Sequence, residues 1–522
     1  MALQDEIYHL RSKARLSRER FAEIMGVSHQ SVSKWESGAS SPDIRNLVKM
    51  AKLFGVSMDT LLLGGDRRTS EIIREITPNY ATMDQGLEYA GQLETEYMQC
   101  MEEGLDIEQY HALFDAIGNL PAGVYKDKMA DVLFSMVLNA PVREGYPYVE
   151  PSALDEIRSL RDGYAVTGNV PERDVLLDKI HGAWLGRACG CLLGKPVEGI
   201  RTNEFYPMLQ EMGNWPLHRY ILSTDIKPDM YDRYTFWLRG RAWADTVDAM
   251  PVDDDTNYTV LYQELIEKSG RDFSPGDVCR MWLRSQPREQ YFTAEKVAYN
   301  NYVKGFEPPY SGSYKNPFRE YIGAQIRGDY FGYINPGDPE TAADMAFRDA
   351  CISHVKNGIY VEMYVSAMIA CAAVTDNMEQ IIRGGMGQIP KISRLYEAVS
   401  GVLDDYLRGV SQKACFRKIH ATYNEHTGYG WCHTISNAMI VTASLLYGCG
   451  DFGKSICMAV EAGFDTDCNG ATVGSVLGMR GGTGCIGPEW SGPVNDSIIT
   501  SIYGVGRVRI SERAEMTMKH LK

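Results

Sequence analysis

The sequence lacks the features that mark membrane and secreted proteins. No stretch reaches the roughly 18 uninterrupted apolar residues of a membrane span, and the opening MALQDEIYHL lacks the basic and apolar regions of a secretory signal. The 12 cysteines lack the C-x-x-C pairing that is typical of zinc sites. We therefore expect a cytoplasmic protein that makes no membrane contact and keeps its thiols reduced.

Basic residues are also fewer than acidic ones, so the chain is acidic overall. The 522 residues carry a net charge of -15, which argues against nonspecific nucleic-acid binding by the whole chain. Residues 1–65 are the exception, with 9 Lys and Arg against 7 Asp and Glu, or +2, so the remainder carries -17. Only this first segment is electrostatically suited to DNA, and a chain of this length predicts two or three domains.

Residues 1–65 have the apolar periodicity of four or five short helices. Ser17 and Ser28 stand where helix N-caps are expected, and Gly26 and Gly38 supply the breaks between helices. The stretch LSRERFAEIMGVSHQSVSKWESG resembles the Cro/C1 and XRE family of helix-turn-helix regulators, and the likeness covers about residues 5–62. The resemblance predicts a five-helix DNA-binding domain at residues 1–65.

In that family the second helix of the motif enters the major groove of DNA, and the first contacts the backbone. Carried across by position, this implies a phosphate contact by Arg18 and base or phosphate contacts by four residues of the second helix: His29, Gln30, Ser33 and Lys34. The alternative is that these polar residues form an ordinary solvated face, because some domains of this type serve only protein contacts. Such domains usually bind paired half-sites as dimers, so we expect a homodimer.

The rest of the chain is expected to be helical as well. Residues 66–174 contain amphipathic segments such as LEYAGQLETEYMQCMEEGL, and we interpret them as a helical connector or dimerisation region. From residue 175 to residue 522, glycine-rich turns separate helical runs and alternating strand patterns are few. The sequence therefore predicts an all-α protein with a large C-terminal domain at residues 175–522.

Two sets of acidic residues stand out in this C-terminal part. Asp253, Asp254 and Asp255 form one set, and Asp465 and Asp467 in FDTDCNGATVGSVLG form the other. Each precedes a helical stretch, so each alone can be read as N-capping acids favoured by the helix dipole. If the sets converge, each close carboxylate pair costs on the order of 4 kcal/mol at an effective dielectric near 20. A divalent cation would relieve this repulsion, and oxygen ligands suit magnesium, manganese or calcium rather than copper or zinc.

The C-terminal part resembles the ADP-ribosylglycohydrolase family, which includes the dinitrogenase reductase-activating glycohydrolases. The likeness spans about residues 176–510 and rests on four ordered motifs: DKIHGAWLGRACGCLLGKPVEG, VDDDTNYT, the segment from GAQIRGD to SHVKNG, and FDTDCNGATVGSVLG. The resemblance implies an orthogonal α-helical bundle with two Mg²⁺ ions, Mn²⁺ being an alternative. It also implies cleavage of a glycosidic bond to ADP-ribose.

The resemblance assigns metal-ligand positions to Asp254, Asp255, Asp465 and Asp467. Asp253 and Cys468 occupy positions where the family usually has threonine, and they complete the candidate ligand set. A third acid raises the negative charge at one ion, whereas a thiol is a soft partner for magnesium, so these two residues put occupancy by two ions in question.

Glu198, in the GKPVEG loop, matches a glutamate that contacts substrate near the scissile bond, and it is the candidate acid or substrate clamp. Asp255 or Asp467 is expected to lie near the attacking water. Residues that match the ADP-ribose pocket are Gly323, Gln325, His354 and Asn357. Lys195 and Arg327 could meet a pyrophosphate or be solvated on the surface. Glu198 has the alternative of a plain loop residue, and His354 that of a core histidine.

Three functions fit these features. The first is a metal-dependent hydrolase of an ADP-ribosylated protein or a related ribosyl small molecule, joined to a DNA-binding domain. The second is a transcriptional regulator whose glycohydrolase-like domain only senses ADP-ribose or a similar ligand, which the changes at Asp253 and Cys468 motivate. The third is hydrolysis of another N-glycoside. The sequence does not separate these chemistries.

Overall fold

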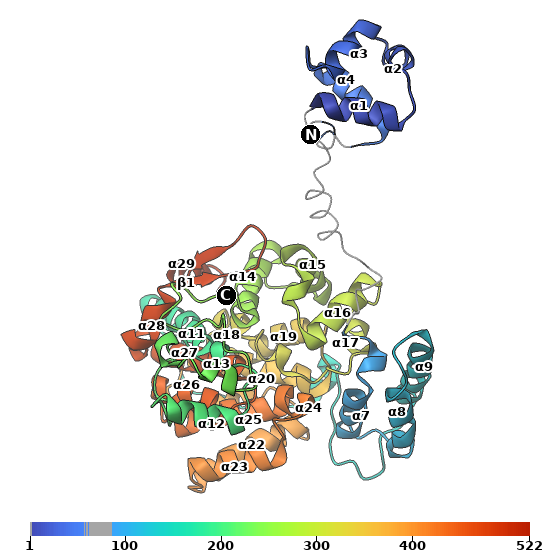
Figure 1. The fold of residues 1–522 in the computed structure, drawn as a ribbon. Coiled ribbons are helices and arrows are strands. Elements are labelled where there is room, and N and C mark those ends of the chain that lie inside the picture. The colour runs from blue at the N-terminus through green and yellow to red at the C-terminus, as the bar shows by residue number, and fades with distance from the viewer. Residues whose placement is uncertain (1–2, 57, 59–60, 62–85) are drawn as a thin grey trace. The chain divides into compact units, whose positions relative to one another are not determined.

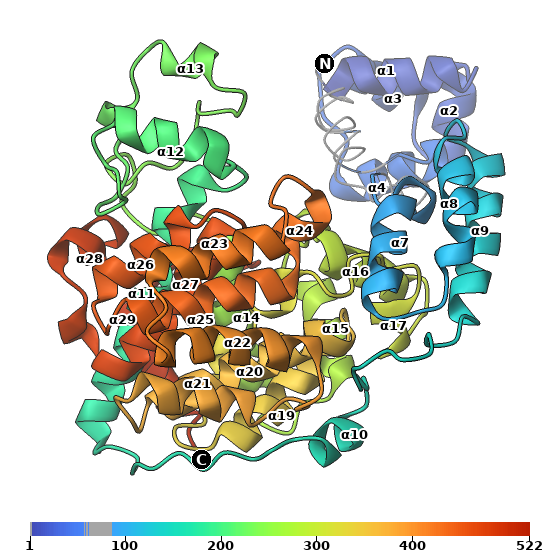
Figure 2. The ribbon, with the colours of Figure 1, turned by 90° about the horizontal axis from the view of Figure 1, so that it is seen from below.

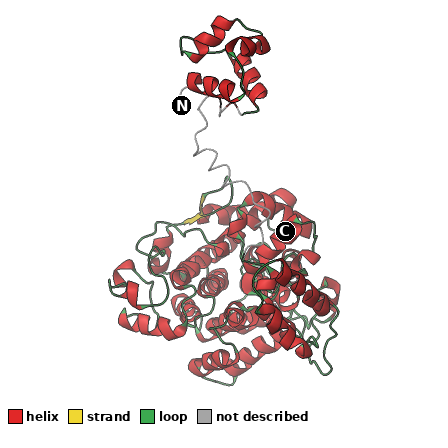
Figure 3. Cartoon of the chain, turned by 45° about the vertical axis from the view of Figure 1, so that its right-hand side comes forward, coloured by secondary structure: helices red, strands yellow, loops and turns green. Residues whose placement is uncertain are grey.

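The computed structural model describes residues 3–56, 58, 61 and 86–522 (Figure 1). The chain divides into two compact units, Met1–Met83 and Asp84–Lys522. Each unit has its own apolar core. Helices dominate both units (Figure 3), and the all-α prediction is confirmed.

The first unit contains the predicted helix-turn-helix arrangement. Its described helices are α1 (Leu3–Lys13), α2 (Arg18–Met25), α3 (His29–Glu36) and α4 (Ile44–Phe54). Ser17 and Ser28 cap α2 and α3 by accepting backbone N–H bonds from Arg20 and Ser31, as the sequence predicts. Gly26 ends α2 in a left-handed conformation. The expected fifth helix falls largely on residues outside those described.

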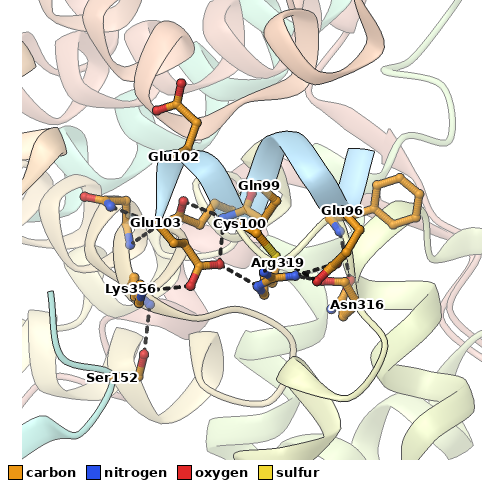
Figure 4. A network of polar contacts seen from close by, with 12 residues as sticks. Glu96, Gln99, Cys100, Glu102, Glu103, Ser152, Asn316, Arg319 and Lys356 are labelled. Atoms are coloured by element: carbon orange, nitrogen blue, oxygen red, sulfur yellow. Dashed lines mark hydrogen bonds and ion pairs between the residues drawn. The ribbon is translucent and has the colours of Figure 1, made fainter. Parts of the chain in front are cut away.

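The second unit begins with a group of helices at residues 86–159, which were expected to be a connector. They are α7 (Leu93–Glu102), α8 (His111–Gly118), α9 (Val124–Leu138) and the short α10 (Leu154–Ser159). The α7–α9 group lies beside α16 (Thr293–Val303) and α17 (Tyr310–Ser313) in Figures 1 and 2, and Phe134 packs edge-on against Tyr314. Buried ion pairs also tie α7 to the larger bundle (Figure 4). The described part of the connector therefore belongs to the second unit, and residues 66–85 lie outside the described residues.

The remaining elements form the large C-terminal bundle. Its longer helices are α11 (Arg173–Gly194), α12 (Thr202–Glu211), α14 (Asp254–Ser269), α15 (Pro275–Ser285), α16 (Thr293–Val303), α19 (Pro339–Ala350), α20 (Lys356–Ala372), α21 (Met378–Met386), α22 (Arg394–Leu407), α23 (Gln412–Thr422), α25 (Thr434–Tyr447), α26 (Phe452–Glu461), α27 (Thr466–Gly481) and α29 (Ile510–Thr517). Its short helices are α13 (Met230–Arg233), α17 (Tyr310–Ser313), α18 (Asp329–Tyr333), α24 (Gly428–Cys432) and α28 (Pro488–Val494). The strands of the described chain are β1 (Ser497–Ile499) and β2 (Arg507–Arg509), which pair antiparallel.

Helices α11 and α27 lie side by side in the bundle (Figure 2). Glycines that recur every four residues on both helices face one another, so the two backbones approach closely. A Cβ atom at Gly190 would lie 1.9 Å from the carbonyl oxygen of Gly470. The close approach places the end of α11 beside the start of α27, because Gly194 meets Thr466.

We expect Gly190→Ala to lower the free energy of unfolding of this unit by about 1–3 kcal/mol, because the added methyl group meets backbone that cannot yield locally. Urea titration would measure the loss. Gly401→Ala in α22 is the control: a Cβ there meets no atom within 4 Å, so this change should stabilise the helix by roughly 0.5–1 kcal/mol. Equal stability of the two variants would contradict the packing argument.

None of the helices in the described part of the chain combines the length and apolar character that a membrane crossing requires. All 12 cysteines are described, and all are free thiols.

Candidate functional site

The first acidic set lies where α14 begins, as its sequence pattern predicts. Asp253 is the N-cap, and its Oδ1 accepts the backbone N–H of Asp255 at 2.9 Å. Its Oδ2 lies 2.6 Å from Nζ of Lys195, which follows α11. Asp253 is therefore both a capping residue and part of a partly buried ion pair. Asp254 and Asp255 form the first turn of the helix.

The second acidic set lies where α27 begins. Asp465 is the N-cap residue, but its side chain makes no capping hydrogen bond. Asp467 lies in the first turn and is buried. Capping therefore does not account for these two carboxyl groups.

The two sets converge, because α11 holds α27 against the start of α14. The ligand atoms of Asp255, Asp467 and Cys468 lie within 4.8 Å of one another, and so do those of Glu198, Asp465 and Asp467. A third group of this kind joins Asp253 and Asp255 to Cys191. Asp254 is not in these groups of described residues, although burial, and after it Asp253 and Asp467, raises the pKa of its carboxyl group well above the ordinary value.

The cluster contains buried carboxyl oxygens without hydrogen-bond partners and closely spaced acidic groups. Asp255 Oδ2 and Asp467 Oδ1 are buried and make no hydrogen bond. Burial, and after it the neighbouring carboxylates, raises the pKa of Asp255 and Asp465 well above the ordinary value. For Glu198, which is exposed at the edge of the cluster, the charge of Asp467 is the foremost cause of a raised pKa. The residues thus fit a hard divalent cation, which would supply the missing positive charge and the missing partners.

Two basic residues of α11 and its end partly balance the cluster. Arg187 is fully buried and bridges Asp255 Oδ1 at 3.1 Å and Asp329 Oδ1 at 2.8 Å. Lys195, a possible pyrophosphate contact in the sequence interpretation, is instead paired with Asp253. Sequence reasoning missed Arg187 and Cys191. Their spacing could have revealed them, because residues 187, 191 and 195 are four positions apart and so lie on the same side of the chain as Lys195.

Two buried thiols also belong to the cluster. Burial raises the pKa of both Cys191 and Cys468 well above the ordinary value, so both are neutral thiols in the metal-free cluster. A neutral thiol is a poor partner for magnesium. The ligand role of Cys468 stays a prediction, and the oxygen atoms dominate the donor set.

The predicted pocket residues separate into two groups. Gln325 Nε2 lies 3.5 Å from Asn469 Oδ1, in the first turns of α27, and Gln325 Oε1 is buried without a hydrogen bond. Gly323 lies against Glu295, because a Cβ atom there would be 1.9 Å from Glu295 Oε1. Gln325 therefore lies close to α27, which carries part of the cluster, whereas Gly323 lies against α16.

His354 and Asn357 are held elsewhere. His354 Nδ1 lies 2.8 Å from Ser353 Oγ, and Asn357 donates to Glu150 and Glu320. Both side chains are buried in these networks, and their substrate-binding role stays a prediction. Arg327 is also fully buried, so the surface-solvated alternative for it is wrong.

Arg327 belongs to a buried acidic group around Glu295, Asp349 and Glu362. Burial raises the pKa of Glu295 from 4.5 to about 7. A carboxyl group whose pKa is raised by folding stabilises the fold fully below pH 4.5, and that contribution is lost as the pH rises through 7.

We expect Glu295→Gln, which stays neutral, to flatten the dependence of unfolding free energy on pH between 5 and 8 by on the order of 3 kcal/mol. Urea titrations at several pH values would measure this difference, with the exposed Glu289→Gln as control. Parallel curves for wild type and Glu295→Gln would disprove this titration.

The helix-turn-helix unit presents the predicted contact residues on its surface. His29, Gln30 and Lys34 are exposed on α3, whereas Ser33 is half-buried. Val32 and Trp35 on the other face are buried in the core. Arg18 is exposed too, but its Nε donates to Glu36 at 2.6 Å, so a phosphate would have to compete with this ion pair.

Comparisons with known proteins agree with both resemblances. The family model described as ADP-ribosylglycohydrolase matches residues 172–518, and the model described as Helix-turn-helix matches residues 7–61. Residues 86–171 lie outside both matches.

Two curated relatives match the first unit only. The chain is 38% identical to the HTH-type transcriptional activator BcrR of Enterococcus faecalis over 64 residues, 12% of this chain and 31% of that protein. It is 40% identical over 48 residues to the SPbeta prophage-derived uncharacterized HTH-type transcriptional regulator YonR of Bacillus subtilis (strain 168), 9% of this chain and 44% of that protein. The chain thus spans less than half the length of these relatives.

A solved structure titled ADP-ribosylglycohydrolase-related protein complex matches with 18% identity and a TM-score of 0.38, covering 66% of this chain and 98% of that one.

Proposed function

The chain belongs to the ADP-ribosylglycohydrolase family, and from that premise we propose that its second unit is a metal-dependent hydrolase of a glycosidic bond to ADP-ribose or a related ribosyl group. The observation that carries the proposal is the convergence of Asp255 and Asp467, each with a buried oxygen that makes no hydrogen bond. Two helix starts meeting in this way form an oxygen-lined cradle, for which Mg²⁺ or Mn²⁺ is the proposed occupant.

The proposed mechanism assigns separate tasks to the residues around the cradle. A bound cation would supply Lewis-acid chemistry and would fix ribose hydroxyl groups. Asp255 and Asp467 would hold the cation and orient water at the sugar, while Arg187 donates to the backbone carbonyl and the carboxylate of Asp255. We assign the role of proton donor to the leaving group to Glu198, which lies at the solvent edge of the cluster.

The deciding experiment is to incubate the protein with a panel of ADP-ribosylated proteins and small molecules, with magnesium and with chelator. Release of free ADP-ribose that needs the metal would support the hydrolase. Binding of ADP-ribose without any release would favour the second candidate, a ligand sensor. The observation that favours the sensor is the Lys195 ion pair, which already neutralises Asp253 and leaves fewer charges for a second ion.

For the first unit we propose sequence-specific DNA binding as a homodimer, with α3 in the major groove. Half-sites would be selected from a random DNA library with the full chain. We expect Gln30→Ala to cost about 1–3 kcal/mol of discrimination at one base pair, because glutamine reads adenine through two hydrogen bonds. Lys34→Ala should weaken binding to all sequences and reduce the salt dependence.

Gel shifts at several salt concentrations would measure both effects, with Lys52→Ala at the end of α4 as the matched control. If no sequence is enriched, or if Gln30→Ala binds every site as tightly as wild type, α3 is an ordinary solvated surface.

A further inference from the structure

A cavity that is separate from the carboxylate cluster lies between α7 and helices α22 and α23 of the large bundle. Its volume is about 600 Å³, within the range of roughly 300–1,000 Å³ typical of small-molecule sites. None of its lining residues belongs to the carboxylate cluster. One wall comes from residues 98–148, which lie outside the family match, and the other from residues 394–439, which lie within it.

A glycine in the middle of α22 keeps this cavity open. Gly401 lines the cavity, and a Cβ atom built there would meet no atom within 4 Å. Glycine inside a helix costs roughly 0.5–1 kcal/mol relative to alanine. The glycines of α11 and α27 offset this cost by close backbone packing, but Gly401 has no such packing. What its missing side chain provides is space.

The floor of the cavity carries a buried hydrogen-bond donor. Arg394 is 7% exposed, and its Nη2 donates to Glu150 and Glu320 at 2.8 Å. Its Nη1 is buried, lacks a hydrogen bond, and has Glu102 Oε2 at 3.7 Å. Figure 4 shows Glu102 on α7 pointing away from the Arg319 network on the other side of that helix. A ligand oxygen would give Arg394 Nη1 the partner it lacks.

The walls and the rim narrow the ligand class. Tyr146, Tyr148 and Tyr423 line the cavity together with methionines, which suits a planar ring. Arg143 adds a second cation, Lys418 is a third that is already paired with Asp405, and Glu397 offers an acceptor for a hydrogen-bond donor on the ring. The lining thus fits an aromatic ring with an anionic group at one end and a donor at the other.

We propose that this cavity is a second ligand site, distinct from the carboxylate cluster, for a small planar aromatic anion. The anion, a carboxylate or a phosphate, pairs with Arg394 Nη1, and the ring lies between the tyrosines. The bound ligand bridges α7 to α22. It therefore ties the helices that follow the helix-turn-helix unit in sequence to the glycohydrolase bundle.

The test is calorimetric titration of the full chain in chelator, so that it does not depend on metal binding or turnover. The probes are 4-hydroxybenzoate, adenosine monophosphate and the neutral 4-hydroxybenzamide. We expect at least one anion to bind with a dissociation constant of about 1 mM or below, and the amide to bind at least about tenfold more weakly than the benzoate if the carboxylate is recognised. Binding of only one anion would assign the carboxylate or the phosphate.

A Cβ atom at Gly401 meets no atom within 4 Å, so the side chain of Gly401→Trp can enter the cavity, and it should weaken anion binding by about tenfold or more. Gly118→Trp, at an exposed helix end with the same open space, is the control and should bind as wild type. Tyr148→Ala removes a wall and should also weaken binding. The proposal is overturned if neither anion binds, or if the anion that binds does so equally well in Gly401→Trp.

Discussion

Replacing Asp467 with asparagine should reduce metal-dependent release of ADP-ribose by about 10²–10³-fold, the size of effect seen when one preorganised electrostatic contact is lost from an active site. The same variant should bind Mg²⁺ more weakly in a calorimetric titration. The change keeps the shape of the side chain, so the effect isolates the charge. Asp467 belongs to two of the groups of converging ligand atoms, and its Oδ1 makes no hydrogen bond within the protein.

Stability should change in the opposite direction from activity. Burial and the charge of Asp253 raise the pKa of Asp467, so ionisation of this carboxyl group destabilises the metal-free fold. We therefore expect metal-free Asp467→Asn to be at least as stable as metal-free wild type, whereas magnesium should stabilise only wild type strongly.

Asp376→Asn is the matched control, because that carboxylate is 80% exposed. Wild-type turnover in Asp467→Asn would remove Asp467 from the mechanism. Loss of activity together with loss of metal-free stability would mean that the residue is structural.

The sequence predicted the parts of the site that are local. The acids at the starts of α14 and α27 could be placed because a helix start orients its first residues in a known way. The glycines of α27 are a local signal too, because Gly470, Gly474 and Gly478 recur every four residues and lie against α11. These signals lie within a few residues of one another.

The sequence could not predict pairings between distant residues. His354 and Asn357 lie in matching segments, yet their contacts are with Ser353, Glu150 and Glu320 rather than with the cluster. Residues 86–159 look like separate amphipathic helices, and nothing local shows that Glu96 and Glu103 meet Arg319. The contacts of Glu96 and Glu103 with Arg319 depend on the fold as a whole, because these partners are more than 200 residues apart.

Arg319→Met should lower the free energy of unfolding of the second unit by about 3–5 kcal/mol, because it leaves buried carboxylates without their partner. Arg319 Nη1 lies 2.8 Å from Glu96 Oε2, and its Nε lies 2.6 Å from Glu103 Oε1 (Figure 4). Gln99 of α7, the helix that carries Glu96, donates to Glu320 at 2.7 Å. Lys356 still pairs with Glu103 in the variant, so Glu96 carries most of the loss.

Urea titration of Arg319→Met would measure this loss, with Arg280→Met as control, because the Arg280 and Asp277 side chains form an exposed pair. Adding Glu96→Met to Arg319→Met should restore much of the stability, since an apolar pair can replace a buried ion pair. If Arg319→Met costs no more than Arg280→Met, α7 is only loosely held. If the loss and its recovery are both observed, residues 86–159 are an integral part of the glycohydrolase unit. The chain then leads from the helix-turn-helix unit into a helix that is fixed to the loop before Gly323 and Gln325.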